Sequence, residues 1–374
     1  MSDHLTTRVL TDAEDAAWHA LLAASPAGTS FLRRDWLDQL AATDSYGTRF
    51  HRVGCFDEKG ALRGGWSLPY RSHAGFHYST YFEFFYAGPV LAPELESGSV
   101  HHASERTRVL QALAQAQGDQ LHIIEAETHP AVHDIRPLLY AGWTAVPLYT
   151  HLWDLADPDH VLASMNREKR RVIKLARERY RFEFTTRTAD REGFLALYRQ
   201  LVTKFDWVPL PRWDHDLRQR MEWLTACDGG RLFTATAKDG TLRAAVLALL
   251  SREDRTAYLW RCAYQPDPES NTIIPALYWQ CALALREEWG APLCVNFGGS
   301  PRPSLAQFKD YLGATPTLHF RLVHDQPGPR TRWWRQARKV KETGRRVLTK
   351  GGILQAWYRA QQGAAPETTP EETP

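Results

Sequence analysis

The chain has 374 residues, and this length predicts two folded units of about 150 residues each with additional segments. Its 46 basic and 43 acidic residues leave a net charge of +3, so the overall charge does not call for a nucleic-acid partner. The N-terminus has no basic-then-apolar signal pattern, no apolar run approaches the ~20 residues of a membrane span, and the five cysteines share no C-x-x-C spacing. We therefore expect a cytoplasmic protein with reduced thiols, no transmembrane segment and no metal site.

The first half of the chain predicts helices followed by strands. Residues 12–25 and 29–43 each have apolar residues at helical spacing. Next comes a strand pair joined by the turn Asp57-Glu58-Lys59-Gly60, in which glycine accepts the positive φ of a hairpin turn. An aromatic block, a helix near 105–117 and a strand at 119–127 complete this half.

The second half repeats this order. "VGCFDEKGALRGGWSLPY" and "LFTATAKDGTLRAAVLALL" both read as a strand, an acid-and-glycine turn and a second strand. We expect helices at 159–180, 191–205 and 215–225, the hairpin at Gly240, a strand at 256–264, a helix at 273–290 and a strand at 292–298. The repetition predicts an α+β fold in which two similar lobes, each a mixed sheet flanked by helices, surround a central cleft.

The composition changes after the second lobe. Residues 323–360 combine Trp with many Lys and Arg, and residues 361–374 are mostly Pro, Thr and Glu. Low apolar content of this kind is typical of disorder. The predicted divisions are an N-terminal lobe at 1–150, a C-terminal lobe at 151–322, a basic helical extension at 323–360 and a disordered tail at 361–374.

Several motifs occur in an order that resembles one family. These are "FLRRDWL", "YAGPV", a basic helix that opens the second lobe, and "NFGGSPRPSLAQFKDYLGA" near its end. Over residues 28–320 the chain resembles the FemAB-like and CelD-type branch of the GNAT superfamily. The resemblance implies two GNAT-like lobes around a cleft, and transfer of an acyl group to an amine. Relatives use either aminoacyl-tRNA or acyl-CoA as the donor.

The resemblance also implies candidate site residues. Lys309, in the "FK" pair, matches a lysine at the donor end of the cleft, where an ammonium could stabilise an oxyanion. The alternative is that Lys309 has no catalytic role and is an ordinary solvated residue of a helix. The other candidates for contact with donor or substrate are Glu83, Trp260, Arg261, Asn296, Gly298 and Gly299.

The donor is predicted from the charges. CoA-dependent relatives have a glycine-rich loop before the helix that follows their fourth strand, and "YQPDPESNTIIPAL" has acids there instead. The basic helix has one face of Arg and Lys. Such a face favours contact with phosphates, and the alternative is a solvated face with no ligand. We expect RNA or phosphate contacts from Arg167, Arg170, Arg171, Lys174 and Arg177, and, in the extension, from Arg332, Arg335 and Arg338.

The extension leaves alternatives open. An apolar stripe of Trp333, Ala337, Val340, Gly344 and Val347 is expected to pack on the body, with the cations facing outward. Exposed arginines and aromatics suit RNA, whereas a helix on a membrane surface would have the same composition.

The sequence predicts an N-acyltransferase that forms an amide bond, with no tightly bound cofactor and with aminoacyl-tRNA slightly favoured over acyl-CoA as co-substrate. A CoA-dependent N-acetyltransferase, and a non-catalytic RNA- or membrane-binding protein, are the alternatives. The acceptor would be an amine on a small molecule or a cell-wall precursor.

Overall fold

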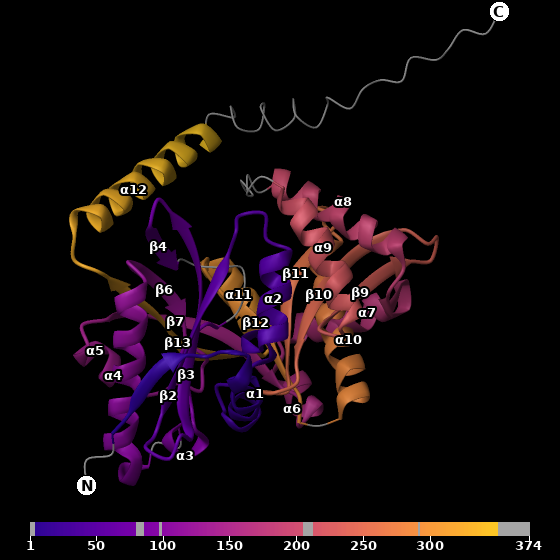
Figure 1. The fold of residues 1–374 in the computed structure, drawn as a ribbon. Helices are drawn as coiled ribbons and strands as arrows, with labels where there is room; N and C mark the ends of the chain where they lie inside the picture. The colour runs from indigo at the N-terminus through magenta and orange to yellow at the C-terminus, as the bar shows by residue number, and fades with distance from the viewer. Residues whose placement is uncertain (1–3, 80–85, 97–98, 205–211, 291, 351–374) are drawn as a thin grey trace, which may run out of the picture.

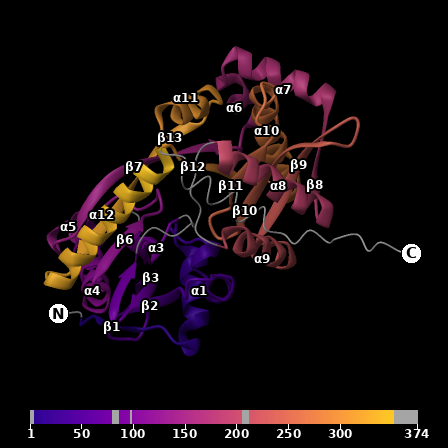
Figure 2. The same ribbon diagram turned by 90° about the horizontal axis from the view of Figure 1, so that it is seen from above.

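The structure is a computed structural model that describes residues 4–79, 86–96, 99–204, 212–290 and 292–350, with side chains to residue 340 (Figure 1). Glu83 and the predicted tail at 361–374 lie outside the described residues. Two lobes lie side by side, and helices flank the strands of each lobe (Figures 1 and 2).

The first lobe contains both predicted helices and the predicted hairpin. Its helix at 34–42, within the predicted range 29–43, buries Trp36, Leu37 and Leu40, which helical spacing brings to one face. The described elements of this lobe are β1 (Thr6–Val9), η1 (Asp12–Glu14), α1 (Asp15–Ala24), η2 (Ser30–Leu32), α2 (Arg34–Ala42), β2 (Arg49–Phe56), β3 (Leu62–His73), β4 (Phe76–Ser79), β5 (Val90–Leu91), α3 (Pro93–Glu96), η3 (Val100–His102), α4 (Ala103–Gln120), β6 (Ile123–Glu127), α5 (Arg136–Tyr140) and β7 (Thr144–Asp154).

The second lobe follows the predicted order, except that one predicted helix is interrupted and that the strands at 180–185 and 315–325 were not predicted. The helix expected at 159–180 is two helices, because Met165 and Asn166 are extended and the Asn166 side chain caps the second helix by accepting from the Glu168 amide. The described elements are α6 (Pro158–Ser164), α7 (Arg167–Arg179), β8 (Tyr180–Thr185), α8 (Thr188–Lys204), α9 (Trp213–Ala226), β9 (Gly230–Ala237), β10 (Leu242–Ser251), β11 (Thr256–Tyr264), α10 (Ser270–Trp289), β12 (Cys294–Gly299), α11 (Pro303–Tyr311), β13 (Thr315–Asp325) and α12 (Pro329–Lys350).

All these strands belong to one mixed sheet. Its order is β1-β2-β3-β4-β6-β13-β7-β12-β11-β10-β9-β8, with β5 paired to β3. The α+β class is confirmed, but a continuous sheet replaces two separate ones. Each lobe has an antiparallel hairpin, β2–β3 or β9–β10, followed by a parallel pair, β4–β6 or β11–β12. The hairpin turns at Gly60 and Gly240 therefore occupy equivalent positions in the two lobes.

The two lobes exchange their last strands. β7, which ends the first lobe, pairs with β12 of the second, and β13, which ends the second lobe, pairs with β6 of the first. β7 and β13 then pair with each other over nine positions at the centre of the sheet. The predicted boundaries at 150 and 322 fall inside these two strands, which carry the chain across from one lobe to the other.

Three apolar cores hold the molecule together. One lies in each lobe, and the third joins them, with Phe31 and Trp36 of the first lobe against Tyr258 and Trp223 of the second. The ring centroids of Phe31 and Tyr258 lie 4.9 Å apart, and those of Trp36 and Trp223 lie 4.7 Å apart. Because aromatic burial makes a large contribution to stability, these contacts help to hold the two lobes together.

Candidate active site

The two parallel strands of the second lobe separate at their carboxyl ends. β11 and β12 pair only at Thr256–Tyr258 and Cys294–Asn296, although β11 continues to Tyr264 and β12 to Gly299. Leu247 lies opposite Arg261 and Ala248 opposite Leu259, so Trp260 is a bulge that bends β11. The opening therefore exposes two strand edges at the carboxyl end of a parallel pair, where ligands of α/β sheets commonly bind.

Asn296 stabilises the end of β12. Its Oδ1 accepts from Thr150 Oγ1 at 2.7 Å and from the Gly298 amide at 2.8 Å, while its Nδ2 donates to the hydroxyl of Tyr86 at 2.9 Å. Gly298 has φ +68°, which glycine adopts without strain. The side chain of Asn296 is only 2% exposed, and these contacts make it a clamp between the lobes rather than a free ligand group.

Lys309 is neither solvated nor free. It is 4% exposed, and its Nζ donates to the carbonyl oxygens of Phe297, Gly298 and Gly299 at 2.9, 2.7 and 2.8 Å. Each of the three N–H groups of the ammonium binds one carbonyl oxygen, so Lys309 holds the end of β12 in place. Burial lowers the pKa of Lys309 to about 8. The alternative prediction, that Lys309 is a solvated helix residue, is therefore wrong. To contact an acyl donor, the ammonium would have to give up its hydrogen bond to one of the three carbonyl groups.

A hydrogen-bonded chain lies beside Lys309. The Oγ of Ser300 is 3.2 Å from His151 Nδ1, and His151 Nε2 is 3.3 Å from Asp310 Oδ1. If Nε2 carries the proton and donates a hydrogen bond to Asp310, then Nδ1 accepts a hydrogen bond from the Ser300 hydroxyl. Burial, together with the charge of Lys309, lowers the pKa of His151, so the imidazole is neutral near pH 7 and can act as a base.

The sequence analysis did not identify this chain. Ser300 lies directly after the two glycines and Asp310 directly after Lys309, so both belong to the quoted motif. His151 comes from β7, the strand exchanged between the lobes, and nothing near it in the sequence relates it to the motif. Only the pairing of β7 with β12 brings the three side chains together.

A buried polar cluster continues from Asn296 toward the first lobe. The ring of Tyr86 lies against His129 and His319, with centroids 5.0 and 5.5 Å apart. Tyr258 donates to Asp254 Oδ2 at 2.6 Å, and His129 lies 3.6 Å from the same oxygen. Burial raises the pKa of Tyr86 and of Tyr258, so both stay protonated. The cluster joins residues from both lobes, and Tyr86 connects it to Asn296 at the point where β11 and β12 separate.

Trp260 and Arg261 lie on the part of β11 that has left β12. Trp260 is 8% exposed and packs in the core shared by the lobes, and the Arg261 guanidinium lies 4.9 Å from the Trp260 ring centroid. The structure thus brings Trp260, Arg261, Gly298, Gly299 and Lys309 to the same end of the two strands.

Acidic residues surround the start of α10, which lies at the carboxyl end of β11. Arg243 pairs with Asp267 at 2.6 Å and with Glu269 at 3.0 Å, and Tyr180 donates to Glu269 at 3.0 Å. A helix N-terminus binds phosphate through free amides and its dipole. Here the carboxylates of Asp267 and Glu269 lie next to the helix start, where they pair with Arg243 of the protein itself and do not cap the helix amides.

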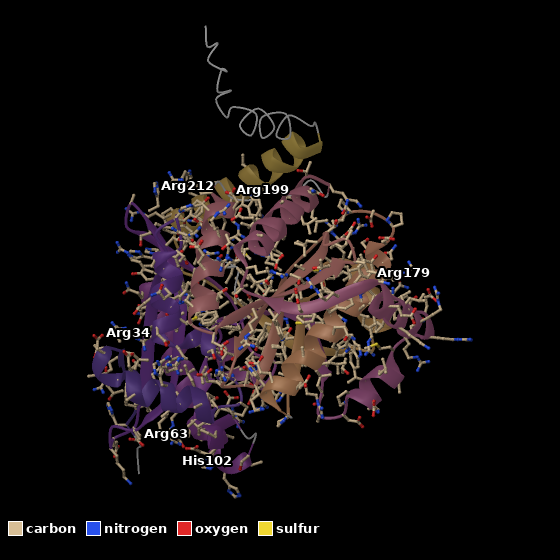
Figure 3. All side chains as sticks on the ribbon, turned by 90° about the vertical axis from the view of Figure 1, so that its right-hand side faces the viewer. Arg34, Arg63, His102, Arg179, Arg199 and Arg212 are labelled. Atoms are coloured by element: carbon tan, nitrogen blue, oxygen red, sulfur yellow. The ribbon has the colours of Figure 1, made fainter. Side chains whose placement is uncertain are left out.

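The exposed face of α7 is basic, as predicted. Val172, Ile173 and Ala176 are buried, whereas all five predicted cations are exposed. Arg171 pairs with Glu168 at 2.7 Å, and Arg170 donates to the Ala163 carbonyl. Over the described part of the chain, no ion pair engages the remaining three predicted cations. Figure 3 shows Arg179, at the end of the same helix, on the outer surface of the second lobe. Of the five cations predicted to contact phosphate, Arg167, Lys174 and Arg177 therefore remain available for such contacts.

The orientation predicted for α12 is wrong. Arg335 pairs with Asp325 at 2.6 Å and also with Glu125, and Arg338 pairs with Glu125 at 3.1 Å, so both arginines face the body. Trp333, Ala337 and Val340 of the expected apolar stripe face water instead, whereas its last two residues, Gly344 and Val347, lie beyond the described side chains. Two carboxylates on β6 and β13 hold the arginines, which are no longer available for phosphate. Arg332 remains exposed, and residues 351–360 of the predicted extension lie outside the described residues.

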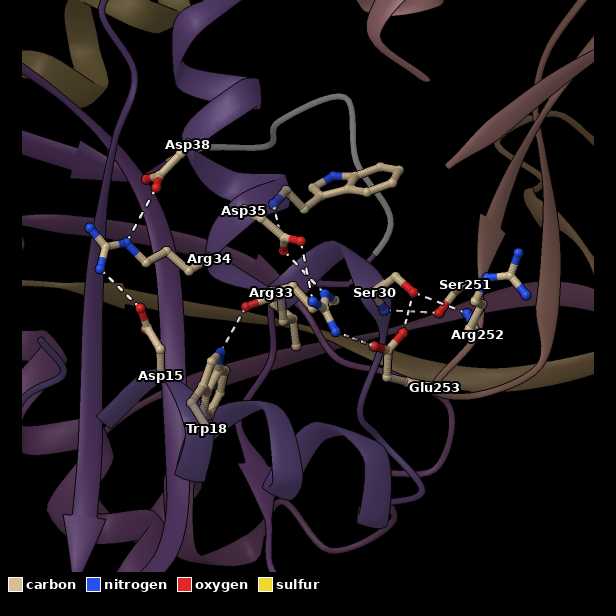
Figure 4. Close-up of polar contacts among 12 residues, drawn as sticks. Asp15, Trp18, Ser30, Arg33, Arg34, Asp35, Asp38, Ser251, Arg252 and Glu253 are labelled. Carbon is tan, nitrogen blue, oxygen red and sulfur yellow. Dashed lines mark hydrogen bonds and ion pairs between the residues drawn. The ribbon is translucent and has the colours of Figure 1, made fainter. Parts of the chain in front are cut away.

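A pocket of about 610 Å³ lies between the lobes at the opposite end of β11. Figure 4 shows its polar wall, where the Ser30 amide donates to Ser251 Oγ at 2.9 Å and Arg33 pairs with Glu253 and Asp35. These contacts join η2 to the turn between β10 and β11. The pocket is thus part of the interface between the lobes and lies away from the strand opening.

Comparisons with known proteins agree with this geometry. Residues 163–309 match the model of the acetyltransferase (GNAT) domain, and no curated protein matches the sequence. FemX is 12% identical, with a TM-score of 0.63 over 84% of this chain and 96% of its own. A tandem GNAT protein from the clavulanic acid biosynthesis pathway is 14% identical, with a TM-score of 0.52 over 87% of this chain and 99% of its own. A GNAT-family acetyltransferase from Colwellia psychrerythraea is 12% identical, with a TM-score of 0.51 over 86% of this chain and all of its own.

The matched domain spans α7 to α11 and so contains the strand opening, the acidic start of α10 and Lys309. At such low identity the solved structures establish the fold alone, and the domain match, over residues 163–309, supports an acyltransferase. The chain thus contains a match to the GNAT acetyltransferase domain over residues 163–309, within a two-lobed fold similar to that of FemX.

Proposed function

We propose that the protein transfers an aminoacyl group from aminoacyl-tRNA to the amine of an acceptor, a small molecule or a cell-wall precursor, without a tightly bound cofactor. The observation that carries the proposal is the distribution of charge around the strand opening. Carboxylates lie at the start of α10, where a CoA pyrophosphate would bind, and three exposed cations of the neighbouring helix α7 have no ion-pair partner among the residues that the structure describes.

The two charged regions adjoin each other. α7 packs along α10, and Tyr180, the residue after α7, donates to Glu269 at the start of α10. A diphosphate at the start of α10 would have to compete with Asp267 and Glu269 for Arg243, which is unfavourable because the two carboxylates already pair with that arginine. A tRNA backbone is long enough to place its acylated end at the opening while its phosphates contact Arg167, Lys174 and Arg177.

The side chains at the opening fit aminoacyl transfer. The acceptor nitrogen attacks the ester carbonyl carbon, a C–N bond forms, and the C–O bond to the tRNA ribose breaks. The proton lost by the nitrogen passes through the Ser300 hydroxyl to His151, and the ribose oxygen takes up a proton as it leaves. Lys309 exchanges one carbonyl partner for the oxyanion, a contribution of about 10²-fold or more.

Retention of labelled donors on the full-length protein tests the donor. Bulk aminoacyl-tRNA and acetyl-CoA are offered separately over a range of salt concentrations. We expect binding of aminoacyl-tRNA that weakens steeply with salt, and no retention of acetyl-CoA. Retention of acetyl-CoA alone would favour CoA-dependent N-acetylation, and retention of neither would refute the proposed donor.

A further inference from the structure

An apolar stripe on α12 faces water. Trp333 is 68% exposed and Val340 is 72% exposed, and Ala337 between them is also exposed. These residues recur at i, i+4 and i+7, so they form one line along the helix. Single exposed apolar residues are ordinary, whereas an aligned row on one helix marks an interaction surface.

The stripe is held in this position by contacts on the opposite face of α12. The Trp334 ring packs on Tyr78 and Phe76, with centroids 5.2 and 6.3 Å away. Arg335 and Arg338 bind the carboxylates of Glu125 and Asp325. Figures 1 and 2 show α12 lying across one end of the first lobe. With about 100° of rotation per residue, this face and the stripe point in nearly opposite directions.

Cations flank the stripe on both sides. Residues 329–340 contain no acid. Arg330 lies on one side of the stripe, and Arg332 and Lys339 lie on the other. All three are exposed, and among the described residues none of them has an ion-pair partner. Tryptophan and aliphatic residues flanked by cations are the pattern of a helix that lies in the headgroup region of an anionic bilayer.

We propose that α12 is an interfacial helix that holds this acyltransferase on the surface of an anionic phospholipid bilayer. The Trp333, Ala337 and Val340 side chains enter the boundary between headgroups and acyl chains, and the three cations contact lipid phosphates. A bilayer fits better than RNA, because Ala337 and Val340 have no π-face on which a base could stack. No described helix is long and apolar enough to cross a membrane, so the contact is peripheral.

Sedimentation of the full-length protein with vesicles tests the proposal. Vesicles of phosphatidylcholine alone are compared with vesicles that also contain phosphatidylglycerol. The double variant W333S/V340S should bind the anionic vesicles about tenfold more weakly or worse, since it removes most of the apolar surface that would be buried. The double variant R332Q/K339Q should lose about fivefold per cation on anionic vesicles and change little on neutral ones.

The control variant is V100S/Y140S, which removes two exposed apolar side chains of the first lobe that belong to η3 and α5 rather than to α12. It should bind vesicles like the wild type, and thermal melting should show that all variants are folded. Quenching of tryptophan fluorescence by brominated lipid should fall in W333S/V340S. Wild type that does not sediment with anionic vesicles, or W333S/V340S that binds them unchanged, would overturn the proposal. Loss of single-stranded RNA binding in R332Q/K339Q without any vesicle binding would identify an RNA surface instead.

Discussion

Replacing Lys309 by methionine tests the central feature of the site. The substitution keeps the apolar stem and most of the volume but removes the ammonium that binds three consecutive carbonyl groups. The end of β12 then loses the contacts that fix it. We therefore expect both stability and turnover to fall, in contrast to the behaviour of a lysine on the surface.

The loss of stability follows from two opposing contributions. Hydrogen bonds from a charged donor contribute about 1.5–3 kcal/mol each. Only the bond to the Phe297 carbonyl is fully buried, so the other two lie near the lower limit, and the three bonds together contribute roughly 5 kcal/mol. Burial of the ammonium opposes this. The pKa of Lys309, which burial lowers to about 8, reflects this opposing cost, and methionine does not incur it. The net loss is about 2 kcal/mol, or roughly 3 °C in melting temperature for a chain of this length.

The dependence of this loss on pH has a definite sign. Because the pKa of Lys309 is lower in the folded state, the unfolded chain binds more protons between pH 8 and 10.5. The wild type should therefore gain stability relative to Lys309→Met as the pH rises through this window. Chemical denaturation at several pH values measures the difference. Lys238→Met, an exposed lysine in the turn between β9 and β10, is the matched control and should change stability by less than about 0.5 kcal/mol.

Single-turnover transfer with saturating donor completes the test. Turnover of Lys309→Met should fall by about 10² or more if the ammonium acts on the donor, and the wild-type rate should decline above pH 8 as Lys309 loses its proton. A variant with lower stability and full single-turnover rate would show that Lys309 only holds the strand end. Unchanged stability would refute the structural reasoning itself.

Four further changes test other parts of the molecule. The double variant K174Q/R177Q should reduce the log–log salt slope of tRNA binding by about 1.4–1.8, and an unchanged slope would place the RNA elsewhere. His151→Gln should slow single turnover by about 10²–10⁴ and abolish the rise in rate with pH through the lowered pKa of His151, whereas a merely structural histidine would leave the pH profile unchanged. Asn296→Leu leaves buried partners unsatisfied and should cost roughly 3 kcal/mol by denaturant unfolding, so a loss within error would contradict its role as a clamp. Glu125→Gln should loosen α12 and speed its proteolysis, and equal cleavage of both proteins would show that the ion pairs do not hold the helix.

Local sequence patterns predicted much of the fold. The turns at Gly60 and Gly240 require positive φ, and both glycines have it, at +79° and +86°. The apolar spacing of α7 predicted its buried face, and its unbalanced cations predicted the exposed one. These features depend on residues a few positions apart, whose geometry the backbone of a helix or hairpin already sets. The repeat of two similar lobes was visible for the same reason.

The contacts that make the site were decided by the tertiary structure. His151 meets Ser300 and Asp310 only because β7 leaves its own lobe to pair with β12, across about 150 positions of sequence. The sequence showed that α12 is amphipathic but not which face is buried, because that depends on Glu125 of β6 and Asp325 of β13 lying beneath it. Hydrogen bonds and ion pairs act over a few ångströms, so partners far apart in the chain can be assigned only when the order of the strands is known.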